Sequence, residues 1–254
     1  MWFGHVEHGP VGAYPRGYLD SAHQPLHLHR EAQLLYAVSG IMRVVTDSGA
    51  WVIPPSRAVW IPPEVAHEIF MSGDVQMRSL FIAPELSPAG LQQCCVLAVT
   101  PLLRELILRA VQGPPHADNP LIQQLMLEEL AGLENLPLHI PMPTDRRLQN
   151  ICLALLHTPD HTNTLEDWAQ QVGASSRTLA RLFQQQVQMS FNAWRQQLRL
   201  MEALPRLLAG DSVQRVAQDL GYGSARAFSA MFRRLLGENP RDYLNTLSKL
   251  SELV

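Results

Sequence analysis

The chain has 254 residues, of which 46% are hydrophobic, and its formal net charge is −3. This length exceeds what one ordinary domain needs and predicts two domains, each with enough apolar residues for a core. No run of about 18 apolar residues occurs, and the first residues lack the pattern of a signal peptide, so we expect a cytoplasmic protein without a membrane span. Cys94, Cys95 and Cys152 are odd in number and poorly spaced for disulfides or zinc, which predicts buried, reduced thiols.

Residues 26–82 have the pattern of a β domain. Short segments that are apolar or alternating are separated by Gly, Pro, Ser and Asp, as in QLLYAVSG, MRVVT, AWVIP, AVWIP and VQMRSLFIA. Many short strands at close spacing predict a sandwich or a barrel. Two helices are expected next, over residues 101–112 and 120–135, and the second carries a broad apolar stripe.

The segment NLPLHIPMPTD contains three prolines and is the clearest linker in the chain. We therefore expect a domain of residues 1–136, a linker of residues 137–144 and a helical domain of residues 145–254. The chain up to Thr144 has 7 Lys and Arg against 13 Asp and Glu, a net charge of −6, whereas the remainder has 13 against 10, a net charge of +3. All cations except Lys249 are arginines, which suit phosphates and base edges, so the second half hints at nucleic acid.

The helical domain contains an internal repeat with an offset of 48 or 49 residues. Each copy starts with an N-cap residue, Thr164 or Ser212, and a short helical pattern that ends at a glycine, Gly173 or Gly221. A second apolar helix then follows, so each copy has the sequence form of a helix-turn-helix. The apolar positions are Leu165, Trp168, Ala169, Val172, Leu179, Leu182 and Phe183 in one copy, and Val213, Val216, Ala217, Leu220, Phe228, Met231, Phe232 and Leu235 in the other.

The second helix of each copy is apolar on one face and carries arginines and small residues on the other. The apolar face would hold the helix against its own domain. The other face suits a DNA major groove, which is about 12 Å wide and offers acceptors to arginine. The candidate DNA-binding residues are Ser175, Ser176, Arg177, Thr178 and Arg181 in the first helix, and Ser224, Arg226, Ser229 and Arg233 in the second.

Residues 191–210 join the two copies. A helix of about 18 residues spans about 27 Å, and equivalent faces of the major groove repeat about every 34 Å. A linking helix of this length could therefore hold two DNA-reading helices in successive segments of the groove. Pro205 predicts a bend or an early end of this helix.

Roughly residues 145–244 resemble the AraC/XylS family of transcription regulators. The family's C-terminal pattern falls on Gly221, Tyr222, Ser224, Phe228, Phe232, Gly237, Pro240 and Tyr243, while Leu244 stands where many members have arginine. The resemblance implies base contacts from Arg177, Thr178, Ala180, Arg181, Arg226, Ser229 and Ala230. Because alanine can only touch a thymine methyl, direct readout is expected to depend mainly on the three arginines of this set.

The β half resembles a cupin barrel, as in many regulators of this family. The matching residues are His27, His29, Gln33 and Gly40 in the first cupin segment, and Pro62 and His67 in the second, with Glu64 in place of a glycine. The three histidines could converge on a divalent transition metal, since imidazoles suit zinc, iron, nickel and copper. Gln33 is a poor ligand and stands where metalloenzyme cupins have a carboxylate, so a polar ligand pocket without metal, or plain packing, stays open.

Aromatic residues in the predicted strands could line a small-molecule pocket or belong to the core of the barrel. The candidate ligand-binding set is His27, His29, Gln33, Tyr36, Trp51, Trp60 and His67. The predicted helix at residues 120–135 has more apolar residues than one contact with the barrel requires. Together with the family's habit of dimerising here, this favours a homodimer interface over packing within the chain.

The expected fold is α+β and multidomain, with an N-terminal cupin-like β-barrel carrying two helices and a C-terminal all-α domain of two helix-turn-helix units joined by a long helix. The expected function is regulation of transcription, as activator or repressor, by sequence-specific binding of double-stranded DNA under control of a small-molecule effector. A neighbouring transporter or metabolic gene is the expected target, and RNA polymerase is a further candidate partner. The alternatives are a metal-dependent cupin enzyme, which Gln33 disfavours, and a structural adaptor that binds protein.

Overall fold

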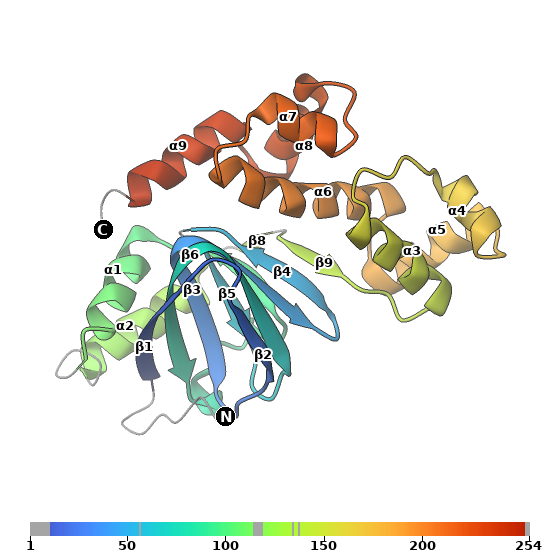
Figure 1. Cartoon of the computed structure of the whole chain (residues 1–254). Helices are drawn as coiled ribbons and strands as arrows, with labels where there is room; N and C mark the ends of the chain where they lie inside the picture. The colour runs from blue at the N-terminus through green and yellow to red at the C-terminus, as the bar shows by residue number, and fades with distance from the viewer. Residues whose placement is uncertain (1–10, 56, 114–118, 134, 137, 252–254) are drawn as a thin grey trace. The chain divides into compact units, whose positions relative to one another are not determined.

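The computed structural model describes residues 11–55, 57–113, 119–133, 135–136 and 138–251, and it contains two compact units (Figure 1). Unit 1 contains most of the chain up to Leu138, and unit 2 contains Ser48–Ala50 and His139–Thr246. Strands make up most of unit 1 and helices make up most of unit 2, which confirms the predicted fold class.

A curled, largely antiparallel sheet forms the body of unit 1 (Figure 1). Among the described residues its strands lie in the order β1-β6-β3-β5-β7-β8, while β2 pairs with β6 and β4 pairs with β3. The longest strands, β3 and β6, pair with each other along much of their length. The bounds are β1 (Val11–Tyr18), β2 (His23–His27), β3 (Ala32–Thr46), β4 (Gly49–Ile53), β5 (Arg57–Ile61), β6 (His67–Ile82), β7 (Cys95–Ala98) and β8 (Asn135–Leu136).

A bulge around Gly40 lets two predicted strands form one continuous strand. Residues 33–40 and 42–46 were expected to be separate strands because glycine reads as a turn residue, but both lie in β3. Gly40 has φ +70, and a Cβ at this position would lie 2.7 Å from the carbonyl oxygen of Asp74 on β6. The register with β6 shifts on both sides of Ser39, so the long strand can bend without ending.

Helices α1 (Pro101–Ala110) and α2 (Pro120–Ala131) cover one face of the sheet (Figure 1). The second ends before the predicted residue 135, because Gly132 takes the C-cap position. Burial of each large apolar side chain in such a core stabilises the fold by about 1.5–3 kcal/mol. The helices contribute Leu103, Ile107, Ala110, Met126 and Leu130, and the strands contribute Leu34, Tyr36, Trp60, Leu80 and Leu97.

Unit 2 contains both helix-turn-helix copies, α4–α5 and α7–α8, with α6 running between them (Figure 1). Thr164 and Asp167 form a capping box at the start of α4, and Ser212 caps α7. Gly173 and Gly221 have φ +65 and +72, so the predicted caps and glycine turns are confirmed. The bounds are α3 (Arg146–His157), α4 (Leu165–Gln171), α5 (Ser176–Val187), α6 (Phe191–Leu208), α7 (Val213–Asp219), α8 (Ala225–Leu236) and α9 (Pro240–Ser251).

Helix α6 continues past Pro205 to Leu208, so the early end suggested for it is wrong. The proline removes one backbone hydrogen bond close to the end of the helix. Trp194, Leu198 and Leu204 of the same helix are fully buried, and this burial outweighs the loss of a single bond.

The segment predicted as a linker, residues 137–144, contains the short strand β9 (His139–Pro141), which belongs to unit 2. The indole nitrogen of Trp194 donates to the carbonyl oxygen of Pro141 at 2.8 Å. This part of the segment is therefore fastened to α6. Proline-rich composition alone could not distinguish a fastened strand from a free linker.

Within the described part of the chain, no helix is both long and apolar enough to cross a membrane. Cys95 and Cys152 are buried free thiols, and Cys94 is half-buried. Burial raises the pKa of the Cys94 thiol to about 12 and that of Cys95 to about 11, which keeps both protonated and unreactive near neutral pH.

Gly40→Ala is expected to destabilise the protein more than Gly73→Ala. Both glycines have φ near +70, so both substitutions place a side chain in the left-handed region. Only at Gly40 would the new Cβ also approach a neighbouring strand at 2.7 Å, whereas nothing lies within 4 Å of it at Gly73. By calorimetry, the Gly40→Ala unfolding midpoint should lie about 4 °C or more below that of Gly73→Ala, and equal midpoints would contradict the role of the bulge.

Candidate functional site

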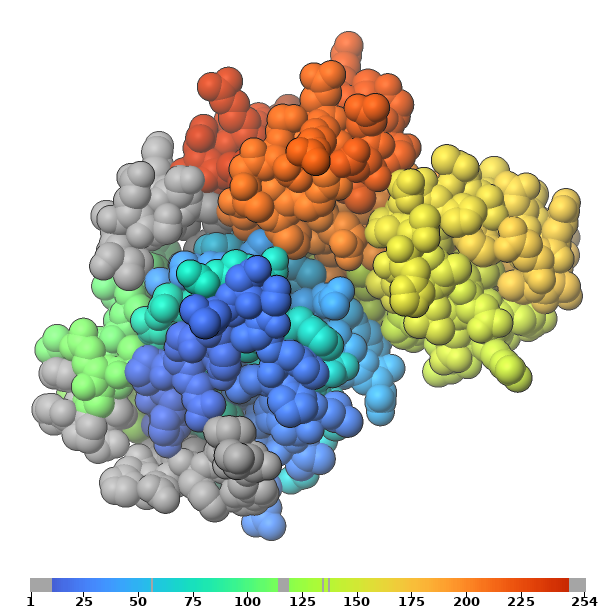
Figure 2. Space-filling view, viewed as in Figure 1, coloured from blue at the N-terminus to red at the C-terminus, as the bar shows by residue number. Residues whose placement is uncertain are grey.

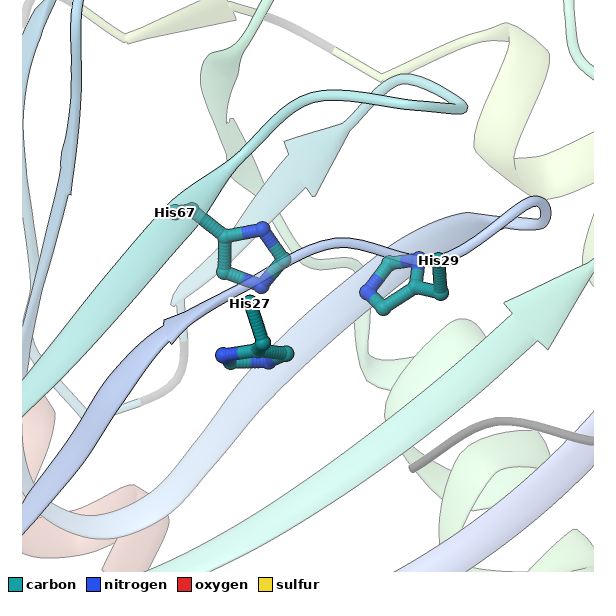
Figure 3. A group of neighbouring side chains, drawn as sticks. All are labelled: His27, His29 and His67. Carbon is teal, nitrogen blue, oxygen red and sulfur yellow. The ribbon is translucent and has the colours of Figure 1, made fainter. Parts of the chain in front are cut away.

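Three histidine side chains of unit 1 point toward one another (Figure 3). His27 ends β2 and pairs with His67 at the start of β6, while His29 lies in the connection that follows β2. One ring nitrogen from each of the three lies within 4.8 Å of the other two. His67 is completely buried, His29 is 5% exposed and His27 is half-buried. The cluster is thus sheltered, and His27 is its most exposed member.

Backbone carbonyl groups determine which nitrogen of each ring carries the proton. A carbonyl oxygen can only accept, so the Nδ1 atom that faces it must donate, and the lone pair is left on Nε2. Nε2 atoms that carry the lone pair of a neutral ring are donors that suit divalent transition metals. The Nδ1 atoms lie 2.8 Å from the oxygen of Pro25 for His27, 2.8 Å from that of Glu31 for His29, and 2.9 Å from that of Val65 for His67.

Gln33 links this cluster to the opposite strand. Its amide lies 2.9 Å from Nε2 of His29 and 3.4 Å from the hydroxyl of Ser79 on β6. The amide oxygen faces Nε2 of His29, and the amide nitrogen donates to the Ser79 hydroxyl. Because a carbonyl oxygen also faces Nδ1 of His29, turning the amide over would let its nitrogen donate to Nε2 of the neutral ring. Gln33 therefore offers a neutral amide, and not a carboxylate, beside His29.

Nε2 of His67 is buried and has no hydrogen-bond partner among the described residues. Burial lowers the pKa of His67 from 6.5 to about 4 and also lowers that of His27, so both rings are neutral at pH 7. A buried acceptor without a partner is destabilising. A bound metal ion, or a donor group of a small molecule, would satisfy it, so these residues fit a ligand.

Two of the predicted ligand-binding aromatics lie elsewhere in unit 1. Tyr36 and Trp60 belong to the core between the sheet and helices α1 and α2, and the Trp60 indole donates to the carbonyl oxygen of Leu91 at 2.7 Å. Side chains alternate along β3, so Tyr36 faces the side opposite to Gln33. Trp51 is 4% exposed on β4.

Two residues beside the histidines escaped the sequence analysis. Phe81 contacts the ring of His29 at 5.0 Å between centroids, and Ser79 contacts Gln33. Both lie on β6, at alternate positions of the strand that His67 begins. Two-residue alternation counted along this strand could have identified them.

In unit 2, helix α5 presents the first set of candidate DNA-binding residues. Arg177 and Arg181 are exposed one turn apart, and Arg181 donates to the side chain of Gln185 at 2.9 Å. Ser175 caps the helix, because its hydroxyl oxygen accepts the backbone N–H of Thr178. Of the remaining members of this set, Ser176 and Thr178 are half-buried and Ala180 is exposed.

Helix α8 repeats this arrangement. Arg226 and Arg233 are exposed, and Ser229 is half-buried between them. Ser224 caps the helix by accepting the backbone N–H of Ala227 at 3.2 Å. Ser175 and Ser224 thus have a structural role beside any contact with DNA.

The opposite faces of α5 and α8 are buried. Figure 2 shows the two helix-turn-helix units as neighbouring lobes of unit 2, yellow for the first and orange for the second. Each lobe therefore presents a helix whose exposed side carries arginine and small residues, as a major groove requires. The buried residues are Leu179, Phe183 and Val187 in α5, and Phe228, Met231 and Phe232 in α8.

Comparison with known proteins assigns a family to each unit. Residues 168–246 match the model of a helix-turn-helix domain, and residues 10–131 match that of an AraC-like ligand-binding domain. The HTH-type transcriptional regulator NimR of Escherichia coli is 35% identical over 236 residues, which cover 91% of this chain and 86% of NimR. The arabinose operon regulatory protein of E. coli is 29% identical over 127 residues, covering 48% of this chain and 42% of that protein.

The enzymatic alternative finds no support in these matches. The named relatives are regulators. Two matched domains and a relative aligned along most of both chains lead to one conclusion: the chain belongs to the AraC family of transcriptional regulators.

Proposed function

We propose that this protein controls transcription by placing α5 and α8, its two recognition helices, in successive major-groove segments of an operator, with a small-molecule effector bound beside the three histidines as the signal. The observation that carries the proposal is the pair of capped helices, each buried on one face and bearing exposed arginines on the other. A neighbouring transporter or metabolic gene is the proposed target.

The arginines and the cap residues have different roles at the DNA. Arg177, Arg181 and Arg226 are long, exposed donors that suit the O6 and N7 acceptors of guanine. Arg233 lies two turns after Arg226 in α8, where a phosphate contact fits its position near the helix end. Ser175 and Ser224 cap their helices and lie where the chain enters the groove, so backbone contacts suit them better than base contacts.

The effector site is proposed at His27, His29, His67 and Gln33. Three converging imidazoles, one of them with an unpartnered buried nitrogen, favour a divalent transition metal, or an organic molecule that donates hydrogen bonds. A bound metal would supply a Lewis-acidic centre that holds an oxygen or nitrogen atom of the effector. Occupancy changes transcription only if the effector binds one state of the regulator more tightly than the other.

A homodimer is proposed through the exposed face of α1 and α2. Leu121 is 75% exposed, Leu102 46% and Leu125 37%, and they lie on the two helices that cover the sheet. Exposed apolar side chains that form one continuous patch mark a partner surface, and we propose that these leucines form such a patch. A dimer would bring two copies of unit 2 to one operator, and contact with RNA polymerase would then decide between activation and simple repression.

Arg226→Ala and Arg181→Ala are each expected to weaken binding to the selected operator by about 1–3 kcal/mol and to relax base preference at one position. The operator would be obtained by selecting bound fragments from random and genomic DNA, and affinity would be measured by fluorescence anisotropy. Arg241→Ala, which removes an exposed arginine of α9, is the control and should keep base preference at every position. Equal weakening on all sequences would instead assign Arg181 and Arg226 to phosphate contacts.

The chain freed of metal is expected to bind one Zn²⁺ or Ni²⁺ ion, and His67→Ala should weaken this binding at least about tenfold. Gln33→Glu should strengthen it, because a carboxylate replaces a neutral amide beside the metal. Isothermal titration calorimetry measures both changes. His23→Ala removes an exposed histidine that pairs with Glu68 at 3.0 Å, and it should bind metal like the wild type. Unchanged affinity in His67→Ala would contradict the metal site.

Leu121→Glu is expected to convert the dimer into a monomer, because it buries a charge in the proposed interface. Sedimentation velocity of the full chain measures the change. Leu153→Glu is the matched control, since Leu153 is 48% exposed on α3 of unit 2. A wild-type chain that sediments as a monomer, or a Leu121→Glu variant that remains dimeric, would contradict the interface.

A further inference from the structure

Two arginines on one side of α6 bind the segment that leads into the first helix-turn-helix. Arg199 is 7% exposed, and it donates from Nε to the carbonyl oxygen of Pro159 at 2.9 Å and from Nη2 to that of His161 at 3.2 Å. Arg195, one turn earlier, donates to the carbonyl oxygen of Asn163 at 3.0 Å. Three alternate carbonyl groups of this segment therefore accept from arginines of α6.

The same Arg199 also contacts the turn of the second helix-turn-helix. Its guanidinium lies 5.3 Å from the ring centroid of Tyr222, at a distance typical of a cation–π contact. Gly221 approaches so closely that a Cβ there would lie 2.8 Å from the carbonyl oxygen of Asp160 and 3.2 Å from Nη2 of Arg199. One buried side chain thus joins the entry of one repeat to the turn of the other.

The two repeats differ where this contact occurs. Gly173, the counterpart of Gly221, has a similar φ of +65, but nothing lies within 4 Å of a Cβ built on it. The first turn continues with Ala174, whereas the second continues with Tyr222 and is one residue longer before its capping serine. The second turn therefore carries an aromatic ring, and its glycine lies against Asp160 and Arg199. The first repeat forms its turn without either feature.

Further contacts fix the second repeat on α6. Arg206 near the end of α6 pairs with Asp211, at 3.1 Å, and with Asp219 at the end of α7. Arg234 of α8 donates to the side chain of Gln196 on α6. These half-buried and exposed contacts join the second repeat to α6 alone, whereas the buried Arg199 contacts both repeats.

We propose that this junction sets the distance and rotation between the recognition helices. It thereby selects operators by the spacing of their two half-elements, the short sequences contacted by α5 and by α8. The junction consists of Arg195, Arg199, the carbonyl groups of residues 159, 161 and 163, Gly221 and Tyr222. Arg199 is a positioning residue that contacts no base. The proposal depends on the proposed binding of one operator by both recognition helices.

The physical reason is preorganisation. One base pair inserted between the two half-elements moves the second by about 3.4 Å and turns it by about a tenth of a helical turn. A rigid pair of helices cannot follow this displacement, so it loses one set of contacts. A loosened pair can follow it, but it binds the correct site less tightly because ordering then occurs on binding.

The test measures spacing discrimination by the full-length protein. The operator selected by the wild-type chain is compared with duplexes in which one base pair is inserted or removed between the half-elements. We expect the altered spacing to reduce the affinity of the wild type about tenfold or more. The affinity of Arg199→Gln and of Tyr222→Leu should fall about threefold or less. This loss of affinity is the spacing penalty. Affinity for a duplex that keeps only one half-element should be the same in all three proteins.

Gly221→Ala and Gly173→Ala provide a matched pair, because both place alanine at a left-handed position and only the first disturbs the junction. Gly221→Ala should reduce the spacing penalty, and Gly173→Ala should leave it unchanged. If Arg199→Gln does not fold, Tyr222→Leu and Gly221→Ala still test whether the junction sets the spacing penalty. Folded variants with the wild-type penalty would overturn the proposal, and a wild-type chain that selects no sequence would overturn the function on which it depends.

Discussion

Aromatic side chains behind the recognition helices hold the DNA-binding unit together. Phe183 of α5 contacts Phe191 and Trp194 of α6, at 5.5 and 6.5 Å between ring centroids. In the second repeat, Phe228 contacts Tyr222 at 5.5 Å, and Phe232 contacts Tyr243 at 5.5 Å. Rings of this size bury about 150–250 Å² each and tolerate few orientations. Because these contacts fix the inner faces, the outer faces have no packing role, and residues there can be suited to DNA alone.

In unit 1, the alternation of side chains along a strand likewise separates a packed face from a face that is available for binding. β3 places Gln33 beside the histidines on one face of the sheet and Tyr36 in the core with α1 and α2 on the other. A ligand bound at the histidines therefore lies one sheet thickness from the helices that carry the proposed dimer surface. A shift of β3 by a fraction of an ångström would reach both faces, since a packed core transmits displacement instead of absorbing it.

The sequence predicted the parts of this structure that depend on local patterns. Caps and turns at Thr164, Gly173 and Gly221 follow from the chemistry of single residues, and the helices follow from their spacing. The continuity of β3 could not be predicted, because a bulge glycine and a turn glycine look the same without the partner strand. Tyr36 also looked like pocket lining, since its face depends on which residues lie across the sheet. Arg199 resembled any other arginine until its carbonyl partners, 38 to 40 positions away, were known.

A fixed spacing between the recognition helices restricts how an effector can act. Arg199 and Tyr222 belong to unit 2, and the histidine cluster belongs to unit 1. If the junction holds the two helices as one body, effector binding cannot alter operator affinity by moving one helix against the other. It must change the presentation of unit 2 as a whole, through the proposed dimer or through the segment that joins the units. The dependence of affinity on the spacing between the two half-elements bound by one chain should then be independent of effector. The dependence of affinity on the distance between the sites of the two protomers should change with effector.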